Sequence, residues 1–174
     1  MNNSKYLDEL GKINLATETY VLKDGKILMF KRSPDAKNFP GFWTVPGGHI
    51  DSEEDALSGA IREIEEEAGV KVDTENIKLK AVTLNHHEDR GQVWVSFVFL
   101  ATIKDNQTAK EKDIEGNAKW IELEELMKME NVFPPLKIYF DHVLNDKPGI
   151  MYTNTQMKNA QLVKILSRTV DRNG

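Results

Sequence analysis

The sequence GHIDSEEDALSGAIREIEEEAGV, residues 48–70, decides the fold because it contains the one long and strongly periodic helix of the chain. The spacing of its apolar residues predicts a helix from about Ser52 to Ala68. Asp51 is suited to the N-cap, Glu54 completes a capping box with it, and Gly69 ends the helix. An apolar stripe predicts that this helix packs against a sheet. The stripe consists of Leu57, Ala60, Ile61, Ile64 and Ala68.

The part of the helix outside this stripe is acidic. Glu63, Glu66 and Glu67 are spaced i, i+3 and i+4, so their carboxylates can converge. Gly59 lies one turn before Glu63 and leaves space on the acidic side. Converging carboxylates repel one another, and a hard divalent cation such as Mg²⁺ or Mn²⁺, which prefers oxygen ligands, would offset that repulsion. The alternative is a solvated glutamate-rich face without a ligand.

The negative charge of the chain is concentrated in this helix. Residues 51–67 contain eight acidic side chains and one basic side chain, a net charge of −7. The whole chain of 174 residues has a net charge of −5, so the remaining residues sum to +2. A nucleic-acid interface would present a basic face or stripe, so we expect no nucleic acid as a partner.

Composition narrows the class of protein further. The chain has no cysteine, which excludes disulfides, thiolate zinc sites and thiol nucleophiles. Its longest apolar stretch, 93–101, is far shorter than the ~20 residues of a membrane helix. The N-terminus lacks the apolar core of a secretory signal. We therefore expect a cytoplasmic, soluble protein with no membrane partner.

The chain is expected to form a single domain over residues 1–174, with 1–13 as an N-terminal leader and 147–174 as a C-terminal extension. Elements follow in the order β-β-β-α-β-β-β-α, a mixed α/β pattern. The Asp24-Gly25 pair predicts a tight turn between the first two strands. The expected strands are 17–22, 26–31, 42–45, 77–84, 92–103 and 120–123, and further helices are expected at 123–129 and 136–144.

The spacing of the polar residues adds a family resemblance. Gly48, five residues, Glu54, seven residues and then Arg62 to Val70 resemble the Nudix box of the Nudix hydrolases at every specified position. The preceding residues, 41–48, also resemble the run into that box, and the likeness covers about 14–145. The resemblance implies an α/β (α+β) fold, the Nudix-type α/β/α sandwich with a mixed β-sheet.

The resemblance also implies a role for each residue of the box. Glu63, Glu66 and Glu67 correspond to the metal-binding glutamates, with the Gly48 carbonyl as an additional ligand. Arg62 corresponds to the arginine that orients a ligand carboxylate, and Glu54 to the residue that pairs with it. A purely structural ion pair is the alternative for these two residues.

The implied reaction is metal-dependent hydrolysis of the pyrophosphate bond in a nucleoside diphosphate linked to another moiety. Glu66 or Glu63 is the expected general base, although some family members place the base outside the box. The absence of the motifs of other branches favours a nucleoside triphosphate, oxidised or not, as the substrate. ADP-ribose or another nucleotide sugar is the first alternative, and a non-catalytic nucleotide-sensing module is the second.

Three residues outside the box are candidate substrate contacts. Arg32 would contact phosphate, Trp43 would stack on a base, and His86 would touch the substrate or act as a base. The alternatives are a solvated arginine, a core tryptophan and a loop histidine.

Two further segments are open to more than one interpretation. Glu111, Asp113 and Glu115 are candidates for a late metal ligand or base. Residues 147–174 have a net charge of +4 and would cover the acidic site, contact a partner subunit in a homodimer, or form a solvated tail. We take the solvated tail as the first expectation.

Overall fold

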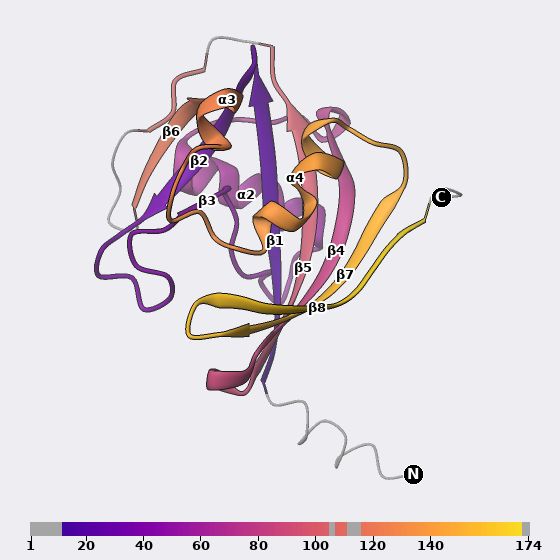
Figure 1. The fold of residues 1–174 in the computed structure, drawn as a ribbon. Coiled ribbons are helices and arrows are strands. Elements are labelled where there is room, and N and C mark those ends of the chain that lie inside the picture. The colour runs from indigo at the N-terminus through magenta and orange to yellow at the C-terminus, as the bar shows by residue number, and fades with distance from the viewer. Residues whose placement is uncertain (1–11, 105–106, 111–115, 172–174) are drawn as a thin grey trace.

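In the computed structural model, which describes residues 12–104, 107–110 and 116–171, a mixed β-sheet has helices on both of its faces (Figure 1). The strands are β1 (Lys12–Lys23), β2 (Lys26–Arg32), β3 (Trp43–Thr44), β4 (Ile77–His87), β5 (Gln92–Thr102), β6 (Gly116–Glu122), β7 (Ile150–Lys158) and β8 (Gln161–Asp171). The α-helices are α2 (Ala56–Ala68), α3 (Leu123–Leu126) and α4 (Leu136–Leu144), and the 3-10 turns are η1 (Thr74–Asn76) and η2 (Glu88–Arg90).

The sheet has the strand order β3-β2-β1-β5-β4-β7-β8, with β6 paired to β2. β1 pairs with β5, and β4 with β7, in parallel, whereas the other neighbours are antiparallel. Asp24 and Gly25 have φ angles of 48° and 77°, as a tight turn with two left-handed residues requires. The predicted hairpin between β1 and β2 is therefore confirmed.

Two apolar cores lie on the two faces of the sheet. On one face Ala60, Ile64 and Ala68 of α2 are fully buried with Val21 and Leu28. The predicted stripe of α2 is thus the packing face, and Leu57 and Ile61 are partly buried at its margin. On the other face the fully buried Tyr20, Leu136 and Tyr139 belong to the second core. This arrangement confirms the expected α/β/α sandwich.

The start of α2 differs from the prediction. The helix begins at Ala56 with Asp55 as its N-cap, and not at Ser52 after Asp51. Asp55 Oδ1 accepts hydrogen bonds of 2.9 Å from the backbone N–H groups of Leu57 and Ser58, which satisfies two donors of the first turn. Glu54 still accepts from the Asp51 N–H at 2.9 Å, but it does so in the loop before the helix. The end is as predicted, with Gly69 left-handed at φ 65°.

The two ends of the chain also differ from their predictions. Residues 12–16, including Ile13 of the expected leader, belong to β1 because they pair in parallel with β5. The leader residues before Lys12 lie outside the described part of the chain. None of the helices in the described residues is long and apolar enough to cross a membrane.

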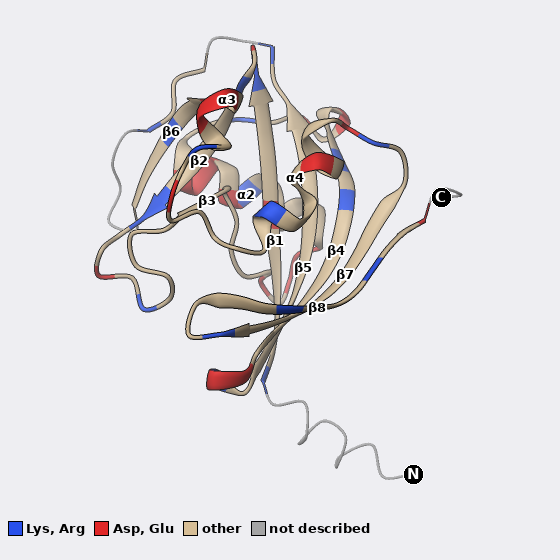
Figure 2. Ribbon diagram, viewed as in Figure 1, with Lys and Arg blue, Asp and Glu red and all other residues tan. Residues whose placement is uncertain are grey.

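The C-terminal extension is not a solvated tail, because it forms the β7–β8 hairpin and extends the sheet. Met151 and Met157 of β7 are fully buried, and Thr153 and Thr155 lie between them on the same face. Figure 2 shows basic residues along β8, the strand at the far edge of the sheet from β3. The acidic helix α2 packs on β1 and β6, so these basic residues do not cover it.

Candidate active site

The site begins with the loop Gly47–Gly48, which passes between β1 and α2. A Cβ atom at Gly47 would lie 2.1 Å from the Thr17 carbonyl oxygen, and one at Gly48 would lie 2.4 Å from Glu63 Oε1. Gly47 therefore requires glycine because its neighbour is rigid backbone, whereas a side chain at Gly48 would displace the Glu63 carboxylate. The Thr17 N–H donates to the Gly48 carbonyl at 2.9 Å, which fixes this loop to β1. The loop backbone is thus held against the acidic face of α2.

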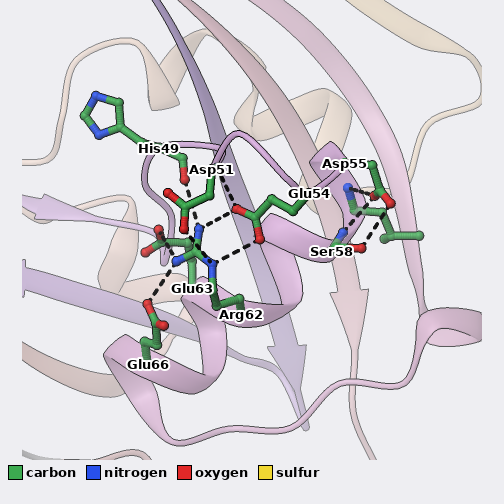
Figure 3. A network of polar contacts seen from close by, with 9 residues as sticks. His49, Asp51, Glu54, Asp55, Ser58, Arg62, Glu63 and Glu66 are labelled. Carbon is green, nitrogen blue, oxygen red and sulfur yellow. Dashed lines mark hydrogen bonds and ion pairs between the residues drawn. The ribbon is translucent and has the colours of Figure 1, made fainter.

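Arg62 is at the centre of the acidic face (Figure 3). Its guanidinium donates to both Glu54 oxygens at 2.6 and 3.1 Å, and to the His49 carbonyl at 3.0 Å. Its Nη1 donates to Glu63 at 2.8 Å and to Glu66 at 2.9 Å. Hydrogen bonding to Glu54 is the main cause that raises the pKa of Arg62, and the same contact lowers the pKa of Glu54. The predicted Arg62–Glu54 ion pair is present, and Arg62 also bonds the carboxylates of Glu63 and Glu66.

Glu67 differs from the other two box glutamates in its surroundings. It is buried, and its Oε2 accepts a 3.0 Å hydrogen bond from the Gly47 N–H. The side chain of Glu63 is 14% exposed and that of Glu66 is 58% exposed. Within residues 12–104, 107–110 and 116–171, no three His, Asp or Glu side chains converge as metal ligands would. At this site the Arg62 guanidinium bonds both Glu63 and Glu66.

The chemistry of this donor set nevertheless fits a hard divalent cation. Glu54, Glu63 and Glu66 surround one guanidinium, so this network has a formal excess of two negative charges. The Glu63 carboxylate lies against the backbone of Gly48, and the Gly48 carbonyl adds a neutral oxygen donor. Carboxylate and carbonyl oxygens are the ligands that Mg²⁺ prefers. A cation would compete with Arg62 for Glu63 and Glu66.

A cavity of about 180 Å³ lies directly beside Gly47 and Gly48. Its walls come from β1, β4 and β5, from the loop that precedes α2, and from the segment before α4. Aromatic rings form much of the lining, with Phe39 and Phe133 packed edge to face at 4.7 Å between centroids. The lining residues are Ala16, Thr17, Glu18, Arg32, Asn38, Phe39, Thr44, Val45, Gly47, Gly48, His49, Asn85, His87, Arg90, Trp94, Ser96 and Phe133.

Glu18 is the buried acidic side chain of this cavity. The Tyr139 hydroxyl donates to its Oε2 at 2.5 Å, and the Ser96 side chain also hydrogen-bonds it. Burial raises the pKa of Glu18, and the two hydrogen bonds partly oppose that shift. Our sequence analysis did not identify Glu18. The available signal was a charged residue two positions before the core residue Tyr20, on the same face of a strand.

Comparison with known proteins identifies the family. A family model described as NUDIX domain matches residues 16–142, which is most of the chain. The chain belongs to the Nudix family. An RNA pyrophosphohydrolase of Pelagibacter ubique is 33% identical over 135 residues, which cover 68% of this Nudix chain and 81% of that protein.

Other relatives match a smaller part of their own length. The m7GpppN-mRNA hydrolase NUDT17 of Danio rerio is 29% identical over 85 residues, 42% of this chain and 28% of that protein. The chain thus spans less than a third of that relative. Among solved structures, a MutT protein of Bacillus halodurans has a TM-score of 0.73 at 23% identity, and the match covers 92% of this chain and 99% of that chain. That similarity shows that the Nudix fold extends over nearly the whole chain.

The structure separates the predicted residues into those beside the Nudix loop and those away from it. Glu63, Glu66, Glu67 and Arg62 lie on α2, and of these Glu67 and Glu63 lie beside Gly47 and Gly48. Arg32 lines the cavity, and its Nε donates to the Asn38 carbonyl at 2.8 Å. The Trp43 ring is not part of the lining and lies 5.6 Å from the Lys31 ammonium instead. Glu111, Asp113 and Glu115 lie outside the described residues.

His87, and not the predicted His86, faces the cavity. Successive residues of a strand face opposite sides, so a shift of one position exchanges the two histidines. His86 lines a separate hollow that includes Gln156 of β7. Burial is the main cause that lowers the pKa of His87, which also packs edge to face with Phe39 at 6.0 Å. Trp94 likewise lines the cavity where Trp43 does not, and its ring lies 4.8 Å from that of His49.

Proposed function

We propose that this Nudix chain hydrolyses the pyrophosphate bond of a nucleoside diphosphate derivative, with a nucleoside triphosphate as the favoured substrate. The observation that carries this proposal is the position of Gly47 and Gly48, which line the aromatic cavity and also touch Glu67 and Glu63. A base in the cavity would direct its phosphates across this loop toward α2. The arginines Arg32 and Arg90 line the same cavity and are suited to phosphate oxygens.

The proposal includes Mg²⁺ or Mn²⁺ as the cofactor. Glu63, Glu66, Glu67 and the Gly48 carbonyl would hold the ion, which would supply Lewis-acid chemistry at the phosphate and make water a better nucleophile. Glu67 is already oriented by the Gly47 N–H at 3.0 Å, whereas Glu63 and Glu66 must exchange Arg62 for the ion. Arg62 remains bonded to both Glu54 oxygens and to the His49 carbonyl, which keeps it beside the site.

Glu66 or Glu63 would act as the general base that accepts the proton of the attacking water. The side chain of Glu66 is 58% exposed and can reach solvent, whereas that of Glu63 is 14% exposed against Gly48. A general base must lie within hydrogen-bonding distance of the water that it deprotonates. The greater exposure of its side chain therefore favours Glu66 as the general base.

Relatives support more than one substrate class. Besides the RNA pyrophosphohydrolase, an 8-oxo-dGDP phosphatase, human NUDT18, is 37% identical over 83 residues. ADP-ribose is the second candidate, because the NUDIX domain of Shewanella oneidensis NrtR in complex with ADP ribose shares the fold at a TM-score of 0.66 and 21% identity. A nucleotide-sensing domain without catalysis is the remaining alternative, and the complete set of box glutamates disfavours it.

A substrate panel tests the proposal. Purified protein is incubated with nucleoside triphosphates, 8-oxo-dGTP, ADP-ribose and a dinucleoside tetraphosphate, with Mg²⁺, with Mn²⁺ or with excess chelator. Release of pyrophosphate from a triphosphate only with metal is the expected result. Cleavage of ADP-ribose alone would select the second candidate. Binding of nucleotides without any turnover would overturn the enzymatic assignment.

A further inference from the structure

The lining of the cavity beside Gly47 contains aromatic rings and the buried acid Glu18. Phe39 packs against Phe133 and His87, and His49 packs against Trp94. Flat aromatic groups of this kind stack on nucleobases without selecting among them, since every base has a π-face. Selection therefore depends on the polar atoms that meet the edge of the base.

Glu18 has the acceptor capacity for such an edge. An ionised carboxylate offers about four lone-pair sites, and Tyr139 and Ser96 donate to two of them. Asn85, also in the lining, is committed elsewhere, because its Oδ1 accepts from Thr155 at 2.6 Å and its Nδ2 donates to Thr83 at 3.3 Å. Glu18 is thus the buried side chain of the lining that can accept two further N–H donors.

The cationic residues of the lining are held in a different place. Arg32 donates to the Asn38 carbonyl at 2.8 Å, and Arg90 donates to the Asn38 side chain. Both arginines are therefore fixed to the loop that precedes β3, whereas Glu18 is in the sheet on β1. The acceptor of the lining is therefore separate from its cations.

We propose that the cavity selects a guanine-type base, whose adjacent N1–H and 2-amino donors both bind the Glu18 carboxylate. This inference rests on the proposed function, since it names the base of the nucleotide that the same site takes. Adenine and cytosine place a ring-nitrogen acceptor beside their amino donor, and uracil has a single N–H between two carbonyls. In each case an acceptor of the base would face a carboxylate oxygen. 8-Oxoguanine retains both donors and belongs to the selected class.

Binding of monophosphates tests this inference without requiring hydrolysis. We would titrate the protein by calorimetry with GMP, IMP and AMP, because IMP differs from GMP only in the missing 2-amino group. Loss of a hydrogen bond to a charged partner is expected to weaken IMP by about tenfold or more relative to GMP. Equal affinities for GMP and IMP, or the tightest binding for AMP, would overturn the inference.

A variant provides the second arm of the test. Glu18→Gln replaces one acceptor by a donor, and a glutamine amide matches the donor–acceptor edge of adenine. The affinity for GMP should therefore fall by about tenfold or more, and the variant should bind AMP more tightly than GMP. Glu75→Gln, an exposed residue of η1, is the matched control and should change neither affinity. A uniform loss for all three ligands would mean that Glu18 has only a structural role and would overturn the inference.

The two proposals fail in different ways. If the protein prefers GMP but cleaves no substrate, the proposed function fails and the base preference stands. If it cleaves triphosphates of all bases equally and binds GMP and IMP alike, the function stands and the role of Glu18 is overturned. Should Glu18→Gln not fold, the comparison of GMP with IMP on the unaltered chain decides the question alone.

Discussion

The acidic face of α2 and the cavity beside Gly47 differ in how their carboxylates are held in place. Arg62 of α2 binds Glu54, Glu63 and Glu66 near the surface, and each partner is at most eight positions away in sequence. In the cavity, Glu18 of β1 is buried and depends on Tyr139 of α4, 121 positions away. The first arrangement is local and can rearrange when a cation arrives. The second is fixed by tertiary packing, which suits recognition rather than chemistry.

The largest expected effect separates catalysis from stability on α2. Glu66→Gln should reduce kcat by about 10- to 100-fold, the usual cost of removing a group that supports a metal site. The melting temperature without metal should change little, because the side chain is 58% exposed. Steady-state kinetics with Mg²⁺ and a thermal melt with chelator measure the two quantities.

Glu65→Gln is the matched control for that change, since Glu65 is an exposed neighbour on the same helix whose partner is Lys71 at 3.6 Å. It should retain nearly full activity. A large fall in the melting temperature of metal-free Glu66→Gln would show that Glu66 is structural and contradict the prediction.

The next effect concerns the loop that joins the two regions. Gly47→Ala would place a methyl group 2.1 Å from the rigid Thr17 carbonyl, so the loop must move. We expect a loss of about 1–3 kcal/mol in the free energy of unfolding, the usual cost of overpacking. Urea denaturation gives the value.

The comparison variant is Gly59→Ala in the middle of α2. Its Cβ would meet the end of the Glu54 side chain at 2.9 Å and make an ordinary contact with Thr17 Cγ2 at 3.7 Å, and alanine favours a helix by up to ~1 kcal/mol. Gly59→Ala should therefore be close to neutral. Equal destabilisation by the two substitutions would argue against a special role for the loop.

A third effect distinguishes the buried acid from the exposed ones. The pKa of Glu18 is raised by burial above its ordinary value of 4.5, so the unfolded chain releases this proton first as the pH rises. Above pH 4.5 the contribution of Glu18 to the free energy of unfolding therefore falls until its folded pKa is passed, by ~1.4 kcal/mol for each unit of pKa difference.

Glu18→Gln removes this dependence. Relative to the unaltered chain, its melting temperature should rise between pH 4.5 and pH 8, as a thermal melt in a series of buffers would show. Glu75→Gln provides the baseline, since it changes an exposed acid. If the difference in melting temperature between Glu18→Gln and the unaltered chain stays constant over this pH range, the raised pKa of Glu18 is contradicted.

The smallest effect tests where α2 starts. Asp55→Ala removes the acceptor of two N–H groups and should cost ~1 kcal/mol of stability. Asp51→Ala, at the position predicted from sequence, should change stability by less than ~0.5 kcal/mol, as surface substitutions usually do. Denaturation of the two variants side by side measures the difference, and the reverse order would restore Asp51 as the cap.

The acidic face of α2 could be predicted from sequence because its geometry is that of a single helix. Positions three and four residues apart lie together on any helix, so the proximity of Arg62 to Glu63 and Glu66 follows from numbering alone. The partner of Glu67 could not be found in this way. Its bond to the Gly47 N–H depends on how the loop crosses β1.

The cavity could not be predicted because it depends on strand register. Glu18, Trp94 and His87 come together only when β1, β5 and β4 are aligned, and a shift of one residue would present His86 instead. The β7–β8 hairpin was also not predicted from the sequence. Its buried face has two threonines between two methionines, so a hydrophobicity pattern shows little of the strand.

The parallel pairing of β1 with β5 also bears on how the chain is made. Lys12 of β1 faces Gln92 of β5, 80 positions later. At ribosomal rates of about 5–20 residues per second, this edge of β1 waits roughly 4–16 s for its partner to be synthesised. During that interval β1 can pair with β2 through the Asp24–Gly25 turn, but its other edge is open to wrong partners. Expression yield should therefore respond to slower translation and to chaperones more strongly than the stability of the finished protein would suggest.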